Sequence, residues 1–359
     1  MKAKKWLAIA TGLLMMTGVL AGCGGGDSAA SSGDSADGQT FLNVSYDPTR
    51  ELYQAFNESF SKKWTEETGE HVNFTQSHGG SGKQARSVRE GLEADVVTLA
   101  LAYDVDEIAA TGLIDKDWIT KFPNNSAPYT STIVFLVRKG NPKNIHDWDD
   151  LVKDGIEVVT PNPKTSGGAM WNYLAAWRYF EKQGASEEEV KASIKTLYKN
   201  VVALDSGARG ATTSFVENGQ GDVLIAWENE AFLSLREYPG KYEIVIPSVS
   251  ILCQPTVAVV DAVARKHGTE EVAKEYLQNL YSPEAQRLIV ENFYRPADPE
   301  TYALFVNENP GDTITVIPED GKWINDKVER VDIEHFGGWE AARKKHFVDG
   351  GVFDSIYER

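Results

Sequence analysis

Two hydrophobic rhythms alternate along this chain from residue 41 onward. Short runs rich in β-branched and aromatic residues predict strands, and longer stretches with apolar residues every three or four positions predict helices. The strands are expected at 41–46, 72–76, 95–99, 132–137, 156–160, 200–204, 223–227, 243–246 and 256–260. The helices between them are expected at 51–66, 87–92, 169–182, 187–198 and 211–218. This alternation predicts an α/β fold with mostly parallel sheets.

Two long apolar strands, 128–137 and 251–261, are the places where the chain is expected to cross between two lobes. About 320 residues follow the N-terminal region, which is too many for one hydrophobic core of ordinary size. We therefore predict lobe 1 from residues 40–129 plus 255–359 and lobe 2 from residues 130–254. Lobe 1 would be completed by C-terminal helices at 270–279, 283–291 and 339–347.

Four of the predicted helices begin in stretches suited to an oxyanion. In one, Ser166 stands at the N-cap position, and Gly167 and Gly168 follow without side chains over their N–H groups. The first N–H groups of a helix have no intrahelical partner and carry partial positive charge. Asp47 is the expected N-cap of another start, and the four starts lie at 45–50, 79–84, 163–168 and 205–211. Because each lies between a strand and a helix, all four can face one crevice, although ordinary capping alone explains any single one.

The same residues give little support to other chemistry. The stretch around Gly82 and Lys83 fails the phosphate-binding-loop pattern at both ends, and that around Ser81 lacks the last glycine of a nucleophile elbow. The six histidines show no metal-ligand spacing. With 36 basic and 53 acidic residues the net charge is −17, which argues against a nucleic-acid partner. We expect no metal, no cofactor and no enzymatic activity.

The N-terminus has the features of an export signal. Three lysines precede an apolar run of about 15 residues, which is shorter than a membrane-spanning helix. The sequence Leu-Ala-Gly-Cys at residues 20–23 resembles the bacterial lipobox, in which cleavage leaves a lipidated cysteine. We predict a signal peptide at 1–22 and a flexible tether at 23–39 that begins with lipidated Cys23, with an ordinary secretory signal as the alternative. Cys253 then has no disulfide partner and is expected to be a buried, inert thiol.

The stretches that carry the helix starts resemble the sulfate-binding proteins of bacterial ABC transporters. The matching stretches are 45–52, 77–84, 162–169, 205–212 and 221–231, and the resemblance extends from residue 41 nearly to the C-terminus. It implies the class II periplasmic-binding-protein fold, in which two α/β lobes close on the ligand. It also implies that dehydrated sulfate is bound by neutral donors: the backbone N–H groups of Asp47, Ser166, Gly167, Gly168 and Ala208, the hydroxyls of Ser81 and Ser166, and the indole N–H of Trp227.

A cage made of donors suits sulfate, because this dianion accepts hydrogen bonds and has no proton to donate. Hydrogen phosphate would bring a proton that faces another donor, at a cost of about 1–3 kcal/mol or more. We therefore expect a monomeric, lipid-anchored receptor that captures sulfate for a membrane permease, with binding nearly unchanged between about pH 5 and 8.

We expect the receptor at the periplasmic or cell-surface face of a bacterial membrane, and we expect Arg209 to brace a loop rather than contact sulfate. Thiosulfate as principal ligand is the nearest alternative. Molybdate or tungstate, an exported serine hydrolase that uses Ser81 or Ser166, and a purely structural lipoprotein are more distant alternatives.

Overall fold

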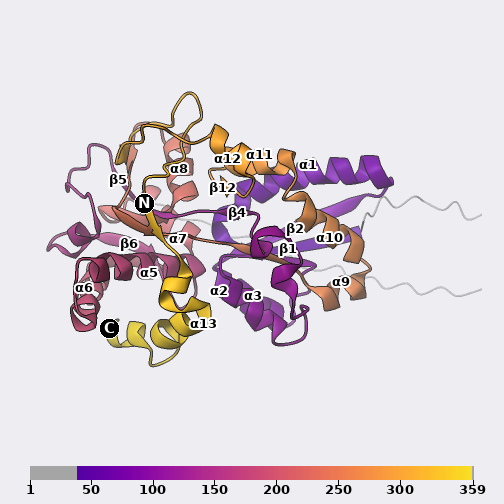
Figure 1. The fold of residues 1–359 in the computed structure, drawn as a ribbon, viewed down its shortest axis with the longest axis horizontal. Coiled ribbons are helices and arrows are strands. Elements are labelled where there is room, and N and C mark those ends of the chain that lie inside the picture. The colour runs from indigo at the N-terminus through magenta and orange to yellow at the C-terminus, as the bar shows by residue number, and fades with distance from the viewer. Residues whose placement is uncertain (1–38, 358–359) are drawn as a thin grey trace, which may run out of the picture. The chain divides into compact units, whose positions relative to one another are not determined.

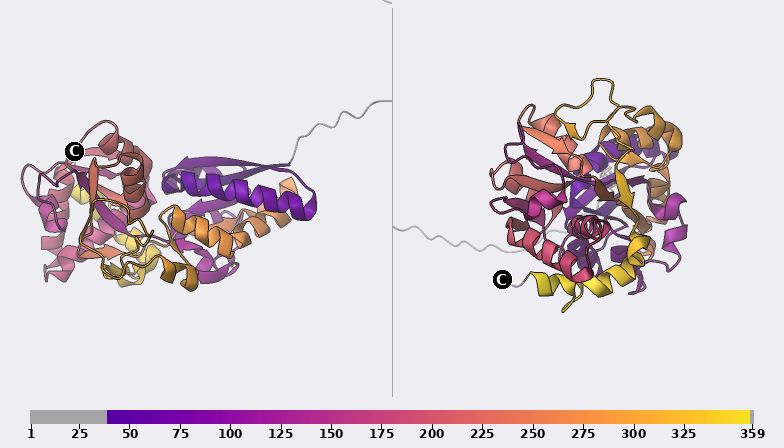
Figure 2. Two further views of the ribbon diagram at one scale, coloured as in Figure 1. Left: turned by 90° about the horizontal axis from the view of Figure 1, so that it is seen from above. Right: turned by 60° about the vertical axis from the view of Figure 1, so that its left-hand side comes forward.

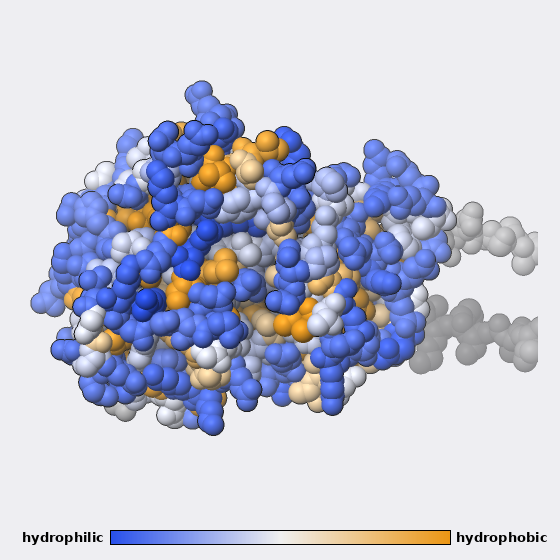
Figure 3. Space-filling model, viewed as in Figure 1, coloured by the Kyte–Doolittle hydropathy of each residue, from blue (hydrophilic) through white to orange (hydrophobic). Residues whose placement is uncertain are grey.

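The computed structural model of the protein describes residues 39–357. The predicted signal peptide, the lipidated Cys23 and nearly all of the predicted tether lie outside these residues. Within residues 39–357, no helix has the length and the apolar character needed to cross a membrane. The face of the molecule in Figure 3 is mostly hydrophilic, in keeping with hydrophobic side chains that are gathered in internal cores.

The first lobe, at the right in Figure 1 and in the left view of Figure 2, is built on a four-stranded sheet in the order β11-β3-β1-β2. β1 (Gln39–Tyr46) runs parallel to β2 (Val72–Gly79) and β3 (Val96–Leu99), and β11 (Thr256–Val259) is antiparallel to β3. Its helices are α1 (Arg50–Thr68), α2 (Ser81–Arg89), α3 (Ala102–Ala109), α9 (Asp261–His267), α10 (Glu270–Asn279) and α11 (Pro283–Glu291). The adjacent residues Val96 and Val97 enter separate cores, so the sheet is buried on both faces.

The second lobe is built on a six-stranded sheet in the order β13-β9-β5-β8-β6-β7. Its strands are β5 (Ile133–Arg138), β6 (Val158–Pro161), β7 (Val201–Asp205), β8 (Val223–Trp227), β9 (Tyr242–Val245) and β13 (Thr313–Ile314). β6 is parallel to β7 and β8, whereas β5 is antiparallel to β8 and β9. The prediction of mostly parallel sheets is therefore wrong for this sheet, because the apolar pattern of a strand does not encode its direction.

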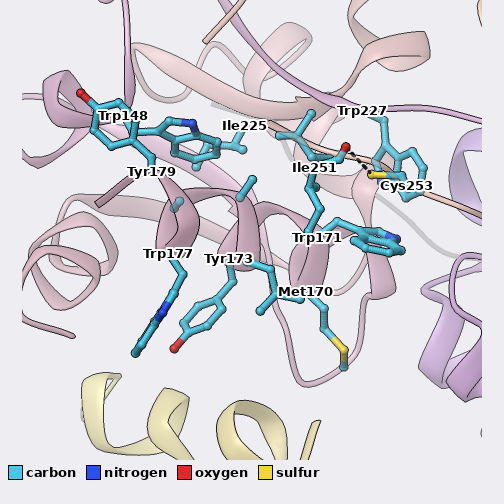
Figure 4. Close-up of a cluster of buried hydrophobic side chains, with 14 of the residues drawn as sticks. Trp148, Met170, Trp171, Tyr173, Trp177, Tyr179, Ile225, Trp227, Ile251 and Cys253 are labelled. Atoms are coloured by element: carbon cyan, nitrogen blue, oxygen red, sulfur yellow. Dashed lines mark hydrogen bonds between the residues drawn. The ribbon is translucent and has the colours of Figure 1, made fainter. Parts of the chain in front are cut away.

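Helices also cover both faces of the second sheet. One core contains residues of α5 (Gly167–Lys182) and α6 (Glu187–Lys199), and the other contains residues of α7 (Ala208–Val216) and α8 (Glu228–Glu237). α5 is apolar around most of its circumference, as befits a buried helix. Figure 4 shows Trp171, Tyr173 and Trp177 projecting from α5 within the first of these cores. This packing holds the N-terminus of α5 in a fixed position.

The two crossings predicted from the sequence lie side by side where the lobes join. Ser131 and Cys253 exchange two backbone N–H···O hydrogen bonds of 2.9 and 3.0 Å. Neither crossing is one continuous strand, because β4 (Tyr129–Thr130) is separate from β5, and Pro255 lies between β10 (Val249–Ile251) and β11. Cys253 is fully buried, and this burial raises the pKa of its thiol well above the ordinary value, as expected for an inert thiol.

The C-terminal part of the chain is divided between the lobes. α10 packs on β11 and α11 packs on α1, so both belong to the first lobe as expected. From β13 onward most contacts are with the second lobe: β13 pairs with β9, β14 (Glu329–Val331) pairs with β10, and α14 (Val352–Ile356) packs on α6. In contrast, α13 (Gly338–Ala342) contacts α3 of the first lobe. The expected assignment of all of 255–359 to lobe 1 differs from these contacts.

The remaining elements are short, and one of them, β12 (Arg295–Pro296), pairs with β4 where the lobes join. The others are α4 (Pro123–Ser126), α12 (Pro299–Leu304), α13 (Gly338–Ala342), η1 (Asp47–Thr49), η2 (Trp118–Thr120), η3 (Trp148–Val152), η4 (Ile333–Phe336) and η5 (Arg343–Phe347).

Candidate anion-binding site

The four helix starts predicted from the sequence meet at one small cavity between the lobes. The first lobe supplies η1, which leads into α1, and the start of α2, while the second lobe supplies the starts of α5 and α7 and the end of β8. The cavity is small, with about 160 Å³ of space between its lining atoms, part of which is open to solvent. It is lined by Tyr46, Asp47, Pro48, Gly79, Gly80, Ser81, Ser166, Gly168, Ala208 and Trp227.

This lining contains six of the seven residues that the sequence predicts for the site; the seventh, Gly167, lies outside it. Among the described residues that form the lining there is no lysine, arginine or histidine. The hydrogen-bond donors available to a ligand are therefore backbone N–H groups, serine hydroxyls and one indole, all of them neutral.

Ser166 caps α5 as the sequence predicts. Its Oγ accepts a hydrogen bond from the N–H of Ala169 at 3.3 Å, which leaves the hydroxyl hydrogen available to a ligand. The backbone N–H of Ser166 instead donates to Asn162 O at 2.9 Å and closes the preceding turn. Of the two donors expected from this residue, the backbone one is thus already engaged.

Close packing explains both glycines that follow Ser166. A Cβ added to Gly168 would lie 2.3 Å from Trp227 Nε1, so only glycine fits beside the indole. A Cβ added to Gly167 would lie 2.9 Å from Ala100 Cβ and from Leu101 Cγ in the first lobe. The sequence predicts glycine at these two positions because their N–H groups contact the anion. That contact remains a prediction for Gly168, which lines the cavity, whereas Gly167 faces the first lobe.

Glycines on both sides of the cavity bring the lobes into contact. A Cβ on Gly80 would lie 2.5 Å from Thr165 O, and a Cβ on Gly207 would lie 2.0 Å from Asp47 Oδ2. The two residues are the N-caps of α2 and α7, respectively. The helix starts can therefore surround one small ligand because no side chain separates them.

Trp227 places an indole N–H in the cavity wall without a protein acceptor. The residue ends β8, pairs with Ile133 of β5, and has its ring 5.2 Å from that of Tyr46. Its side chain is 1% exposed, and Nε1 is buried without a hydrogen-bond partner. An unpaired buried donor costs about 1–3 kcal/mol, which an acceptor from a ligand would relieve. Two other described residues have an unpaired indole N–H, Trp64 and Trp323, and neither lines this cavity.

Ser81 lies in the wall but is bonded to a residue that sequence reasoning missed. Its hydroxyl donates to Asp104 Oδ2 at 2.5 Å and accepts from the N–H of Ala100 at 3.0 Å. Asp104 is 3% exposed, and this burial raises the pKa of its carboxyl to about 6, although the Ser81 hydrogen bond and the charge of Arg343 act in the opposite direction. Asp104 belongs to α3, which is not among the four predicted starts, so no sequence motif marks it.

Asp47 lines the cavity, but it is the first residue of η1, and Tyr46 takes the N-cap position expected for Asp47. Its carboxylate is 3.5 Å from Arg50 Nη2. Burial raises the pKa of the Asp47 carboxyl, against the opposing charges of Arg50 and Arg209. The contribution expected of Asp47, a backbone N–H, does not depend on this carboxylate.

Arg209 of α7 forms ion pairs between the lobes, outside the cavity lining. Its guanidinium donates to both carboxylate oxygens of Glu51 on α1 at 2.9 and 2.8 Å, and lies 2.9 Å from the carboxylate of Glu230 on α8. Burial favours a higher pKa for Glu51, but the hydrogen bonds from Arg209 outweigh it and the pKa lies below the ordinary value. Arg209 therefore links the two lobes through Glu51, where the sequence predicts a brace for a neighbouring loop, and its charge is neutralised by carboxylates.

The described residues do not assemble catalytic or metal-binding chemistry around Ser81. His78, the histidine near it in sequence, has Nε2 2.5 Å from Gln76 Oε1 and Nδ1 3.4 Å from Tyr46 O, so it is not bonded to Ser81. Burial lowers the pKa of His78 to about 4. Within residues 39–357, no group of histidine, cysteine, aspartate and glutamate side chains is arranged to hold a metal ion.

Two α/β lobes that meet around a small polar cavity define a solute-binding protein. A model of the bacterial extracellular solute-binding proteins matches residues 45–295. The chain is 58% identical over 320 residues to the sulfate-binding protein of Escherichia coli K12, covering 89% of this chain and 93% of that protein. It is 48% identical over 322 residues to the thiosulfate-binding protein of Pseudomonas aeruginosa, covering 89% and 92%, respectively.

A solved structure of a sulfate-binding protein is also similar to this chain. The sulfate-binding protein SubI from Mycobacterium tuberculosis H37Rv has a TM-score of 0.72 and 30% sequence identity, over 85% of this chain and 98% of that one. The chain therefore belongs to the bacterial extracellular solute-binding proteins and, within them, to the group of sulfate- and thiosulfate-binding proteins. The resemblance drawn from the sequence and the two-lobed α/β fold that it implies are confirmed.

Proposed function

We propose that this protein captures sulfate outside the cytoplasm and delivers it to the membrane permease of an ABC transporter. The observation that carries the proposal is the buried indole N–H of Trp227, which has no protein acceptor and lies in a cavity made by four helix starts. Because the cavity is small and its lining offers neutral hydrogen-bond donors, it suits a small oxyanion. The names of the relatives, sulfate-binding and thiosulfate-binding protein, support the same class of ligand.

Neutral groups would hold the anion. The N-termini of α2, α5 and α7 direct their unpaired N–H groups and the positive ends of their dipoles toward the same cavity. Arg209 is committed to Glu51 and Glu230, so the two charges of sulfate would be stabilised by dipoles and hydrogen bonds alone. The donors that we assign are the backbone N–H groups of Asp47, Gly167, Gly168 and Ala208, the hydroxyls of Ser81 and Ser166, and the indole of Trp227.

The same donor set would discriminate against hydrogen phosphate. Sulfate carries no proton near neutral pH, so each of its oxygens accepts. Hydrogen phosphate carries a proton that requires an acceptor, and an unsatisfied buried pair costs about 1–3 kcal/mol or more. We therefore expect selectivity for sulfate to follow from the predominance of donors among the ligand-facing groups.

We further propose that the protein is a monomeric, lipid-anchored receptor without enzymatic activity. The Leu-Ala-Gly-Cys sequence at residues 20–23 supports lipidation at Cys23, and the Gly/Ser-rich stretch after it supports a tether. Replacing Cys23 by alanine should move the protein from the membrane fraction to the soluble fraction. Unchanged membrane association in that variant would contradict the anchor.

A thermal-shift screen with sulfate, thiosulfate, molybdate and phosphate tests the ligand. A ligand at 100 times its Kd stabilises the folded protein by about 2.7 kcal/mol, so sulfate should raise the melting temperature far more than phosphate. Thiosulfate is the second candidate, because a relative 48% identical to this chain is named for it, and a larger shift with thiosulfate would favour it. No shift with any of the four anions would contradict both.

A further inference from the structure

Two buried side chains of the second lobe donate hydrogen bonds to the backbone of the first lobe beside the anion cavity. They are Trp171 of α5 and Asn229 of α8. We propose that these two are positioning residues, which hold the first-lobe part of the anion cage against the second lobe and so determine how long sulfate is retained. This inference rests on the proposed sulfate site, and it adds two residues that do not line the cavity.

Trp171 reaches the first lobe from the same face of α5 as Gly167. The two residues are four positions apart, so they lie one above the other along the helix. A Cβ on Gly167 would lie 2.9 Å from Ala100 Cβ, and the Trp171 indole N–H donates to Ala100 O at 3.2 Å. Figure 4 shows this indole turned away from Tyr173 and Trp177, which pack on other rings of the second lobe. The hydrogen bond therefore crosses from one lobe to the other.

Ala100 connects Trp171 to a predicted sulfate donor. Ala100 is fully buried and follows β3, and its N–H donates to Ser81 Oγ at 3.0 Å. The same residue thus accepts from the second lobe through its carbonyl and orients Ser81 through its N–H. The Trp171 indole also packs edge-to-face against Trp339 of α13, with ring centroids 4.5 Å apart. This packing fixes the direction of the indole N–H.

Asn229 makes the corresponding hydrogen bond at another wall of the cavity. Its Nδ2 donates to Pro48 O at 3.0 Å, and both residues are buried. Pro48 lines the cavity next to Asp47, whose backbone N–H is one of the assigned sulfate donors. Asn229 comes two residues after Trp227, so one short segment supplies a sulfate donor and a link to the opposite lobe.

Burial distinguishes these two hydrogen bonds from the ion pair that also links the lobes. The side chains of Arg209 and Glu51 are each 27% exposed, and a partly exposed ion pair is weakened by water and salt. The hydrogen bonds of Trp171 and Asn229 are neutral and buried, so the loss of either donor leaves a buried carbonyl unpaired. Their contribution should therefore not depend on salt.

The two hydrogen bonds should act on the release of sulfate rather than on its capture. Both require the lobes to be in contact, so neither exists in an open form that admits an anion. Because the cavity lies between the lobes, sulfate leaves only after both bonds have broken. Weakening either one should raise the dissociation rate constant koff and leave the association rate constant kon nearly unchanged.

Trp171→Phe and Asn229→Leu test the proposal. Trp171→Phe keeps an aromatic ring in the core but leaves Ala100 O without its donor, so koff should rise about 5- to 50-fold while kon stays within about twofold. Asn229→Leu removes the other donor at nearly constant volume. It should raise koff about 3- to 10-fold, because loss of the unpaired Asn229 Oδ1 offsets part of the cost.

Trp148→Phe is the matched control for Trp171→Phe. The Trp148 indole is also fully buried, and its N–H donates to Val249 O at 2.8 Å, but this hydrogen bond lies within the second lobe. The control should therefore lower the melting temperature without sulfate and leave koff within about twofold of that of the unmodified protein.

Asn172→Leu is the matched control for Asn229→Leu. Both asparagines are buried and have an unpaired Oδ1. The Nδ2 of Asn172, however, donates within the second lobe, to Thr160 Oγ1 at 3.0 Å and to Ile225 O at 3.1 Å. This control should likewise change stability without changing koff.

The experiment measures both rate constants for the unmodified protein and the four variants. Stopped-flow tryptophan fluorescence after mixing with sulfate gives kon. The loss of bound radiolabelled sulfate after addition of excess unlabelled sulfate gives koff. A residue that only stabilised the fold would lower the melting temperature without raising koff selectively.

The outcomes separate this proposal from the proposed function. A raised koff with unchanged kon in Trp171→Phe and Asn229→Leu, and in neither control, supports the positioning role. An unchanged koff in both variants, or an equal rise in the controls, would overturn that role and leave the sulfate receptor standing. No sulfate binding by the unmodified protein would overturn the proposed function itself. If Trp171→Phe does not fold, Asn229→Leu and its control still decide.

Discussion

Ser81 and Ser166 occupy similar positions in the sequence and have different chemistry in the cavity. Each lies after a strand, near the start of a helix, and directly before a glycine. Ser166 is an N-cap whose Oγ accepts the N–H of Ala169, so its hydrogen is available to a ligand. Ser81 is the first residue of its helix, and its hydrogen belongs to Asp104. The Ser166 hydroxyl is therefore oriented by the capping of its own helix, whereas the Ser81 hydroxyl is oriented by Asp104 on another helix.

The same contrast separates the two lobes. The second lobe contributes donors that do not titrate near neutral pH, among them the Trp227 indole, a buried side-chain donor without a protein partner. The first lobe contributes Ser81, whose hydroxyl already donates to Asp104. We therefore expect the second lobe to contribute most of the selectivity for a proton-free anion. Five variants test this division, and those that change sulfate affinity are given in order of decreasing effect.

Gly168→Ala should have the largest effect, because its Cβ would lie 2.3 Å from Trp227 Nε1 and displace the indole. We expect sulfate affinity to fall by at least about 100-fold, or roughly 2.8 kcal/mol, by titration calorimetry. Gly82→Ala is the control, because its Cβ would make no contact shorter than 3.7 Å. Normal affinity in Gly168→Ala would show that this wall does not form the site.

Trp227→Phe removes one donor while preserving most of the ring packing. Hydrogen bonds to charged groups contribute about 1.5–3 kcal/mol, so sulfate affinity should fall about 10- to 100-fold. The melting temperature without sulfate should change little, because the lost N–H has no protein partner. Trp323→Phe removes an indole N–H that is equally unpaired but lies outside the cavity, and equal losses in the two variants would refute a specific role for Trp227.

Ser166→Ala and Ser81→Ala compare the two serines directly. Ser166→Ala should weaken sulfate binding about tenfold at every pH and should also cost about 0.5–2 kcal/mol of stability through the lost cap. Ser81→Ala should weaken sulfate binding less than Ser166→Ala, because the hydroxyl hydrogen of Ser81 already has a protein acceptor in Asp104. Dissociation constants of the two variants test this, and equal losses of affinity would contradict the distinction.

Asp104→Asn should change the stability of the protein without sulfate. The pKa of Asp104 is about 6 in the folded protein and 3.8 ordinarily, so the folded state binds the proton more readily than the unfolded state. The ionised carboxyl therefore destabilises the fold above about pH 6, and this destabilisation disappears as the pH falls through 6 toward 4. The variant should be more stable by about 1–3 kcal/mol at pH 8 and little changed at pH 4.5, by denaturant unfolding. A less stable variant at pH 8 would contradict this.

Much of the fold could be predicted because local patterns carry it. β8, α10 and α11 have the expected bounds, since their apolar runs end at clear breaks. α2 begins at Ser81 instead of 87, because its first turn is polar and has no apolar periodicity to mark it. The direction of β5 and the pairing of β13 and β14 with the second lobe were not predictable, because they depend on contacts between distant segments.

The anion site, like the fold, could be predicted from the sequence only in part. The helix starts were recognisable from capping residues and glycines, and they do converge on one cavity. Asp104 was not recognisable, because it lies 23 residues from Ser81 in the chain and only the packing of α3 on α2 brings the two together. The engaged N–H of Ser166 was likewise hidden in the geometry of a turn.

The central claim is that a cage of neutral donors selects a proton-free dianion. Side-by-side calorimetric titrations of the unmodified protein with sulfate and with inorganic phosphate at pH 6 test it most directly. We expect 1:1 sulfate binding that is at least about 100-fold tighter than phosphate binding, in line with the cost of an unsatisfied buried proton. Equal affinity for the two anions would contradict the claim.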